Sequence, residues 1–537
     1  MAIRKSSNLG IPFGGTSGRP ANPANGQPYF NGDIGRLELY TSATGWQNIV
    51  QETPGVASAT GTYNESAGSG TFTVSGTNFV SGAIAYAVGT NGVEYEAAST
   101  TYNSLVQLTV TFSNLSVAYE PYDIKVINPS NLFGLLPDAF YINDNPVWST
   151  SAGSLGTFNS GSSVSLQLSV TDDESNSLTY TVSSGSLPGG LSLSSAGLIS
   201  GTIVATSGTS SFTVSVSDGN NPSQTRSFSI TCLAPVVTGG TLTSDSTYYY
   251  RAFTGSGTLA VSNASLTADL LIVAGGGPGG GNLAGGGGAG GYKAYTSYSI
   301  PAASHSVTIG AGGARVQGSQ TGGRGSNGTN TSLGSIFTCI GGGAGGSGEP
   351  GSEFNGLSGG SGGGSTGYTA SVTRASGTSG QGYDGGVSGR GGPNYPGAGG
   401  GGSSAQGEDV SNSNNRAGDG GAGTLNAILG TNYYWAAGGG GGIYVAGSTR
   451  AGNGGIGGGG GGGSNGSAAG TGGGSAYNSG LSGTAVNTGG VSTGNTGGDA
   501  GANTGSGGGG ACHSASTGGA GGSGIVVVRY TKAAVGG

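Results

Sequence analysis

The feature that most constrains this chain is the distribution of its glycine. The chain has 126 glycines among 537 residues, and most lie after residue 250, in runs such as 285–288, 399–402, 438–442 and 457–463. Such enrichment is typical of collagen, of a flexible low-complexity tail or of packed polyglycine segments. Collagen is excluded, because the chain has no sustained Gly-X-Y triplet and only 17 prolines.

The borders of the glycine runs favour packing over flexibility. Apolar, strand-like segments at 270–274, 306–309, 336–340 and 433–437 lead directly into glycine, and the segment 525–530 shows the reverse junction. A disordered tail lacks such apolar surface. Extended polyglycine II has about three residues per turn and no internal hydrogen bonds, so its backbone groups must bond to neighbouring segments. We therefore expect a packed array, with a largely disordered tail as the alternative.

The rest of the composition predicts an all-β protein. Charged residues make up 7% of the chain, and Glu, Lys and Met are scarce, so good helix formers are few. A net charge of −7 and a pI near 4.8 exclude the basic groove that a nucleic acid needs. We expect no membrane span and no secretory signal, because no apolar segment is long enough for either.

Changes in pattern divide the chain into four segments. Residues 1–52 form an N-terminal arm and hairpin, 53–144 and 145–234 each contain spaced strand-like runs, and 235–537 contain the glycine. We expect tandem Ig-like β-sandwiches followed by a glycine-rich domain of β-strands and packed polyglycine-II segments.

In the first segment, two alternating stretches at 34–40 and 45–50 flank a polar turn and predict a hairpin. Residues 26–31, 35–40 and 45–46 resemble an N-terminal module of bacteriophage virion proteins, especially those of marine cyanophages. The resemblance implies docking to the particle. The docking candidates are Leu37, Leu39, Tyr40 and Trp46. The alternative is an ordinary capping hairpin.

The segment 53–144 has alternating runs at 70–76, 83–88, 105–112 and 122–128, the pattern of a β-sandwich. The stretches 71–79 and 122–129 resemble an IPT/TIG immunoglobulin-like domain. Such domains serve mainly as spacers, so the resemblance implies a fold and little about function.

The segment 145–234 has strand-like runs at 165–170, 178–182 and 211–216. The turn sequences at 187–193 and 197–201 are similar to those of the cadherin-like, putative-Ig family, some members of which bind calcium between modules. The carboxylates with suitable hard oxygens are Asp172, Asp173, Glu174 and Asp218. The alternative is a solvated turn, and we expect no metal or cofactor.

The glycine-rich segment resembles the glycine-rich domains of phage tail-fibre adhesins. The resemblance rests on residues 268–277, 288–292, 307–313 and 521–528. It implies a polyglycine-II core whose tip loops contact the host surface.

No catalytic constellation is visible, so we expect no enzyme. The only histidines, His305 and His513, are far apart in sequence, and the run 275–281 lacks the Lys-Ser/Thr of a phosphate loop. Cys232, Cys339 and Cys512 form no CxxC pair, and we expect them to be buried as small apolar residues.

Aromatic residues isolated between glycine runs are the candidate receptor contacts, because rigid rings flanked by Ser, Asn and Gly resemble a binding surface. They are Tyr368, Tyr383, Tyr395, Trp435, Tyr444 and Tyr477. The alternative is that these rings close the edge of the array, and the strand-like stretch 433–435 leans towards that core role.

The sequence predicts a phage tail-fibre adhesin, made in the host cytoplasm without a signal peptide and carried on the virion. We expect it to bind a bacterial surface glycan or outer-membrane protein, to contact other virion proteins through its N-terminal segment and to form a homo-oligomer, with a trimer as the guess. The main alternative is a structural decoration fibre of the capsid or neck. A secreted bacterial matrix protein is disfavoured by the missing signal peptide.

Overall fold

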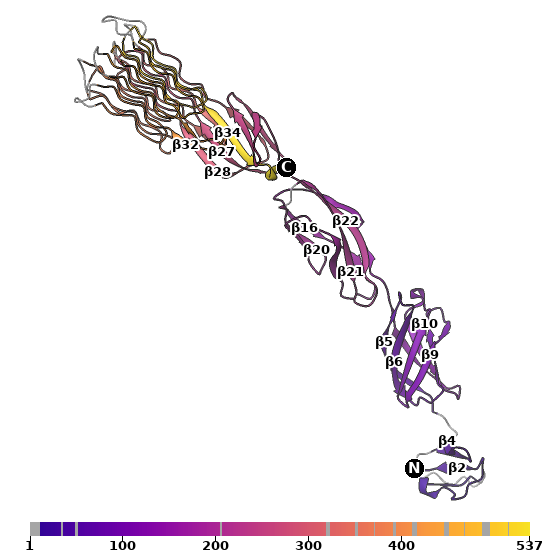
Figure 1. The fold of residues 1–537 in the computed structure, drawn as a ribbon. Helices are drawn as coiled ribbons and strands as arrows, with labels where there is room; N and C mark the ends of the chain where they lie inside the picture. The colour runs from indigo at the N-terminus through magenta and orange to yellow at the C-terminus, as the bar shows by residue number, and fades with distance from the viewer. Residues whose placement is uncertain are drawn as a thin grey trace.

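A computed structural model describes residues 11–33, 36–48, 52–204, 207–317, 323–348, 353–369, 371–389, 394–410, 416–444, 450–466, 468–485, 495–513 and 515–536. Within these residues the protein is all-β, with three short 3-10 turns and no α-helix. Its units follow one another in a row, from a small N-terminal sheet to an array of extended glycine segments at the far end (Figure 1).

The N-terminal unit is a four-stranded sheet in which the predicted hairpin is confirmed. Its strands are β1 (Phe13–Gly14), β2 (Pro28–Asn31), β3 (Arg36–Thr41) and β4 (Gly45–Asn48), with a 3-10 turn η1 (Thr16–Gly18). Part of the N-terminal arm is extended by the sheet itself, because β2 pairs with β3 of the hairpin and β1 pairs with β2. Residues 34–35 and 49–50 of the predicted strands lie outside the described residues.

The next unit is a sandwich of two sheets. One contains β13 (Ile142–Asn143), β5 (Gly55–Asn64), β6 (Ser69–Thr77), β10 (Gln107–Ser113) and β9 (Ser99–Ser104), and the other contains β12 (Phe133–Phe140), β11 (Tyr122–Ile127), β7 (Ile84–Val88) and β8 (Glu94–Glu96). Alternation explains β10, whose Leu108, Val110 and Phe112 are fully buried between the sheets. After η2 (Val117–Tyr119), the Tyr122 hydroxyl donates to the Ser116 carbonyl at 2.9 Å, as in the tyrosine corner of Ig domains.

The second sandwich has a core around Trp148, Phe212 and Phe228. Its strands are β14 (Val147–Trp148), β15 (Gly153–Asn159), β16 (Ser163–Gln167), β17 (Val170–Thr171), β18 (Thr179–Gly185), β19 (Leu191–Leu193), β20 (Leu198–Thr202), β21 (Gly208–Ser217) and β22 (Gln224–Leu233). The predicted strands at 178–182 and 211–216 are confirmed as β18 and β21, and the predicted strand at 165–170 is divided between β16 and β17.

Hydrogen bonds join the two sandwiches at residues 143–145. The Asn143 amide donates to Asp218 Oδ2 at 2.7 Å, and the Asn221 amide donates to the Asp144 carbonyl at 2.7 Å. The Asn64 amide also crosses the junction, to the Asn220 carbonyl at 2.5 Å. These bonds restrict bending between the two sandwiches.

The glycine-rich region begins with a third sandwich, which the sequence did not predict as a unit. One sheet contains β23 (Val236–Thr238), β26 (Gly257–Ser262), β29 (Ser304–Thr308), β30 (Thr331–Leu333) and β31 (Phe337–Cys339). The other contains β24 (Thr241–Ser244), β25 (Tyr248–Phe253), β34 (Ile525–Thr531), β27 (Leu266–Val273) and β28 (Tyr292–Ile300). A 3-10 turn η3 (Ala533–Val535) follows β34, which lies between β25 and β27.

Beyond this sandwich, the glycine segments run side by side towards the far end of the molecule (Figure 1). A hairpin of β32 (Thr424–Asn426) and β33 (Tyr433–Trp435) packs against its base, and Trp435 contacts the same cluster as Val527.

Hydrogen bonding shows that the array is polyglycine II. The backbone N–H groups of Gly286, Gly287 and Gly288 donate to Ala398, Gly508 and Gly343, at 3.0, 2.8 and 2.8 Å. The next three residues repeat this order of partner segments, with bonds from Ala289 to Gly401, Gly290 to Gly505 and Gly291 to Ile340. A three-residue repeat of bonding directions is what a helix of three residues per turn produces. The predicted packed array is confirmed.

The same spacing explains why glycine is required. A Cβ added at Gly287 would lie 2.2 Å from the carbonyl oxygen of Gly277, and one at Gly439 would lie 2.0 Å from that of Gly508. Segments therefore approach at backbone distance, and the array satisfies its buried N–H and C=O groups by bonding to each other. The resulting core has almost no side chains.

Candidate functional site

At the end of the array away from the third sandwich, five aromatic rings form a continuous row. We call Phe354, Tyr368, Tyr395, Tyr444 and His513 the aromatic row. Each residue adjoins a glycine segment that leads back to the strands, so the rings lie at the end opposite those strands. Each ring is half-buried, which leaves part of it facing solvent.

The rings contact one another in order. Phe354 and Tyr368 are stacked with centroids 5.7 Å apart, and Tyr368 and Tyr395 are stacked at 6.2 Å. Tyr444 meets Tyr395 edge-on at 6.3 Å and stacks on His513 at 5.2 Å. Aromatic pairs at these separations contribute about 0.5–1.5 kcal/mol each beyond burial, so the rings hold each other in position.

Backbone and hydroxyl bonds fix the row to the array. Thr366 Oγ1 donates to the Leu283 carbonyl at 2.6 Å, and the Gly367 N–H donates to the same oxygen at 2.9 Å. The Tyr444 N–H donates to the Asn394 carbonyl at 3.3 Å. Burial lowers the pKa of His513, so its imidazole is neutral at pH 7 and the row carries no charge. The row offers apolar ring surface and hydroxyl groups on a rigid support.

The structure divides the predicted receptor contacts into three groups. Tyr368, Tyr395 and Tyr444 belong to the aromatic row. Trp435 is fully buried, and its indole N–H donates to the Asn426 carbonyl at 3.4 Å, so its prediction as a surface contact is wrong. Sequence alone could not separate the two roles of Trp435, because an aromatic ring beside a glycine run can pack in a core or lie on the surface.

The last group lies away from the row. Tyr477 is 38% exposed and stacks on Trp435 at 5.7 Å. Tyr383, 51% exposed, is on the loop between Gly377 and Asp384.

Two members of the row were missed by sequence reasoning, Phe354 and His513. Both adjoin a glycine segment at its far end, as the predicted tyrosines do. The signal that could have found them is this shared position. In the sequence, the notable feature of His513 is instead its neighbour Cys512.

The N-terminal docking candidates lie on opposite faces of their sheet. Tyr40 and Trp46 pair edge-on at 5.5 Å and form a small core with Tyr29. By their register, Leu37 and Leu39 lie on the other face, beside Phe30. Phe13, which pairs with Phe30, is 53% exposed on that same face. We call Phe13, Phe30, Leu37 and Leu39 the N-terminal apolar face.

Two of the calcium candidates, Asp218 and Asp172, accept hydrogen bonds from backbone N–H groups of their own loops. Asp218 accepts the N–H groups of Asn220 and Asn221, at 3.0 and 2.9 Å, and Asp172 accepts that of Asn176 at 2.9 Å. Burial raises the pKa of Asp218, but its hydrogen bonds outweigh that effect and lower it overall. Asp173 is exposed, and Glu174 accepts the Asp144 N–H at 3.2 Å. Nowhere in the described ranges do three acidic, His or Cys side chains gather as a metal ion would need.

Among these groups Asp144 is the most perturbed. Burial, with repulsion from Glu174 and Glu65, raises its pKa to about 6, and its Oδ1 atom is buried without a hydrogen-bond partner. The charge of the Asp144 carboxylate is therefore disfavoured at the junction between the two sandwiches, and burial also raises the pKa of Glu174 beside it.

The cysteines are buried and unpaired, as predicted. Burial raises the pKa of Cys339 to about 12 and that of Cys512 to about 11, so both are thiols at neutral pH. His305 is also buried, and its Nε2 lies 2.9 Å from the Pro301 carbonyl. These groups belong to packing.

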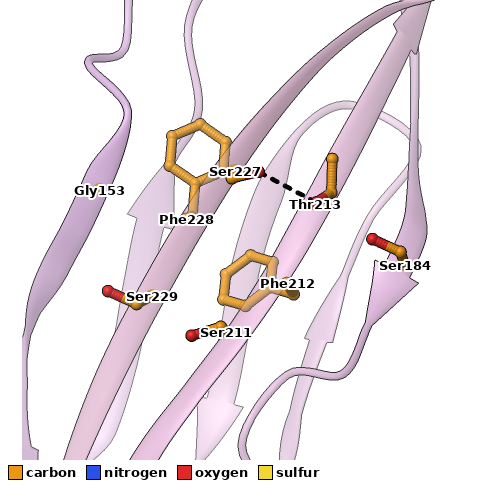
Figure 2. A pocket seen from close by; sticks show the side chains of 8 residues that line it. All are labelled: Gly153, Ser184, Ser211, Phe212, Thr213, Ser227, Phe228 and Ser229. Atoms are coloured by element: carbon orange, nitrogen blue, oxygen red, sulfur yellow. Dashed lines mark hydrogen bonds between the residues drawn. The ribbon is translucent and has the colours of Figure 1, made fainter.

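The second sandwich has a shallow depression of about 390 Å³ on the sheet that contains β21 and β22 (Figure 2). Its side chains are mainly hydroxyls, and Thr213 and Ser227 hydrogen-bond to each other at 3.1 Å. Phe212 and Phe228 lie beneath it and are buried. The residues that line it carry no charged side chain.

Across the described residues, we find no helix of the length and apolarity that a membrane span requires.

Comparisons with known proteins give similar solved structures and two matching family models. Solved structures similar to it include the first two immunoglobulin domains of DIP-gamma, at 12% identity and TM-score 0.22, covering 34% of this chain and 99% of that chain. Others are titin domains I67–I69, at 11% and 0.23, covering 40% and 76%, and protocadherin gamma B2 cadherin domains 3–6, at 16% and 0.20, covering 39% and 60%. No curated protein matches the chain. Residues 146–232 match the family model named Putative Ig domain, and residues 251–484 match the one named Glycine-rich domain. The chain therefore contains an Ig-like domain of that family, followed by a glycine-rich domain.

Proposed function

We propose that this protein is a phage tail-fibre adhesin that attaches the virion to a bacterial surface receptor through the aromatic row. The observation that carries the proposal is the position of the row: a set of half-exposed rings at the free end of a rigid array. Rigid aromatic groups bind with little loss of conformational entropy, which suits a receptor contact.

The remainder of the chain fits a fibre. The sandwiches stand in line between the two ends, and bonds at residues 143–145 limit bending (Figure 1). Several copies on one particle would bind with avidity even if each contact were weak.

In this proposal the opposite end docks to the particle. The N-terminal apolar face presents Leu37 and Leu39 beside the exposed ring of Phe13. Burying such a face on another virion protein contributes about 25 cal/mol per Å² of apolar area. Tyr40 and Trp46 would then act indirectly, by holding the sheet together.

The test uses the purified full chain, fluorescently labelled, on a panel of marine cyanobacterial strains. We expect saturable binding to at least one strain and competition with adsorption of a phage that carries the protein. Tyr395→Ala and Tyr444→Ala remove neighbouring rings, and each should weaken binding at least about tenfold.

Tyr141→Ala is the matched control, because Tyr141 is 55% exposed on the first sandwich, far from the row. It should bind like the parent. Absence of binding on every strain at micromolar multivalent protein would reject the adhesin and favour the decoration fibre.

A further inference from the structure

We propose a second binding site on this protein: a groove beside the start of β28 that holds a neutral saccharide. The groove has two adjoining hollows of about 560 and 280 Å³, which share Tyr292 and Gly380. The larger lies within the range of roughly 300–1,000 Å³ typical of small-ligand pockets. The site lies at the base of the array, separate from the aromatic row.

The groove has a preformed wall. Gln381 connects the loop between Gly377 and Asp384 to two neighbouring segments: its carbonyl accepts the Tyr292 N–H at 2.9 Å and its Oε1 accepts the Ile340 N–H at 2.8 Å. At the start of the loop, Thr378 Oγ1 donates to the Gly359 carbonyl at 2.8 Å. A loop fixed in this way loses little entropy when a ligand binds.

The chemistry of the lining matches a sugar. Tyr383 offers a ring that is 51% exposed, on which the C–H face of a pyranose can pack. Asp384 Oδ1 accepts the Gly377 N–H at 2.9 Å, which fixes the carboxylate as an acceptor for sugar hydroxyls. Gln406 and Ser379 supply an amide and a hydroxyl, each able to donate and accept.

A further hydroxyl is already oriented. The Asn426 amide donates to the Tyr292 Oη at 2.9 Å, so the phenol proton is not used in this bond and can be donated to another acceptor. A mixed set of donors and acceptors around one exposed ring is what a ligand rich in hydroxyl groups requires.

Charge selects the class of saccharide. Asp384 is the charged side chain of the larger hollow, and Lys293 lines only the smaller one. An anionic sugar in the larger hollow would face a carboxylate at close range, which is unfavourable. We therefore assign the groove to an uncharged oligosaccharide.

The test is titration calorimetry of the full chain with maltotriose, cellotriose and triacetylchitotriose as neutral probes and sialyllactose as the anionic one. We expect at least one neutral trisaccharide to bind with a Kd of roughly 0.1–5 mM, more tightly than sialyllactose. Tyr383→Ala and Asp384→Asn should each weaken that binding at least about tenfold.

Both variants preserve the fold. The backbone of Tyr383 keeps its bonds to Gly402 and Gly362, and an Asn at position 384 can still accept the Gly377 N–H through its amide oxygen. An unchanged thermal transition checks this. Tyr141→Ala controls for loss of an exposed ring, and Tyr395→Ala controls for the aromatic row; both should keep the parent affinity for the sugar.

The proposal is overturned if no neutral trisaccharide binds at about 10 mM, if sialyllactose binds more tightly, or if neither groove variant changes the affinity. Because Tyr395→Ala affects only cell attachment, failure of the groove and failure of the adhesin proposal give different results.

Discussion

The two Ig-like sandwiches and the glycine array solve the same problem of burying a β-rich chain in opposite ways. In the sandwiches, side chains such as Phe228 and Val214 fill the space between sheets. In the array, that space is absent, and backbone groups such as Gly287 N–H and Gly508 C=O meet directly. The core of a sandwich depends on the volume of its side chains, and the core of the array depends on the absence of side chains.

The difference teaches where each region tolerates change. A sandwich can lose a methyl group and keep its fold at a moderate cost, because neighbours partly relax. In the array, an added carbon meets the backbone of a neighbouring segment, and that segment cannot move away without breaking its hydrogen bonds to other segments. Four predictions test this comparison.

The largest effect should come from Gly287→Val. Its Cβ would lie 2.2 Å from the Gly277 carbonyl oxygen, so the array should lose more than about 4 kcal/mol of stability, beyond ordinary point mutations. Limited proteolysis should then degrade the glycine-rich region while sparing the two Ig-like sandwiches. Gly474→Ala is the control, because an added Cβ there has no neighbour within 4 Å. Equal resistance of both variants would refute the backbone-packed core.

Phe228→Ala should cost about 3–5 kcal/mol, because it removes a fully buried ring from the second sandwich. In a calorimetric scan we expect only that sandwich's transition to move, since distant sites contribute independently. Val204→Ala, at a side chain 72% exposed, should leave the scan unchanged. A shared downward shift of the array transition would show that the two regions are coupled.

Asp144→Asn should stabilise the junction by about 1 kcal/mol at pH 7, a value reduced for partial solvent screening. The folded pKa of about 6 lies above the unfolded value of 3.8, so the stability from the protonated carboxyl is full below pH 3.8 and is lost as pH rises through 6. The variant should lack this slope in urea titrations between pH 4 and 7. An identical pH dependence of unfolding in parent and variant would contradict the raised pKa of Asp144.

The smallest effect should come from Glu94→Gln, which breaks the 2.7 Å ion pair with Lys125 on the first sandwich. Exposed pairs contribute little, so we expect a loss below about 0.5 kcal/mol in urea unfolding. A loss above about 2 kcal/mol would contradict the minor contribution expected of this ion pair.

Prediction from sequence succeeded where one segment carries its own pattern. The alternation of Leu108, Val110 and Phe112 marks β10 without reference to any partner. It failed for β5, whose small and polar residues become a strand through pairing with β6. The packed array was predictable because strands lead into glycine, but the third sandwich was not, since its sheets join segments distant in the chain.

The same limit applies to the candidate site. Each tyrosine of the aromatic row stood out among glycines, yet nothing local brings Tyr395 to Tyr444. Their contact depends on the register in which glycine segments bond, such as Gly397 N–H to Gly442 C=O at 2.8 Å. Trp435 carried the same local signal and became core, because its hairpin packs on β27 and β34.

The central place of β34 has a consequence for biosynthesis. Val273 and Ile525 are partners in the sheet, although the whole array lies between them in the chain. The ribosome must therefore finish every glycine segment before the third sandwich can close, and until then the edges of β25 and β27 that face β34 are unpaired. Truncation or ribosome pausing within the array would leave a chain whose two Ig-like domains are complete. Its third sandwich would be unfinished and prone to aggregation.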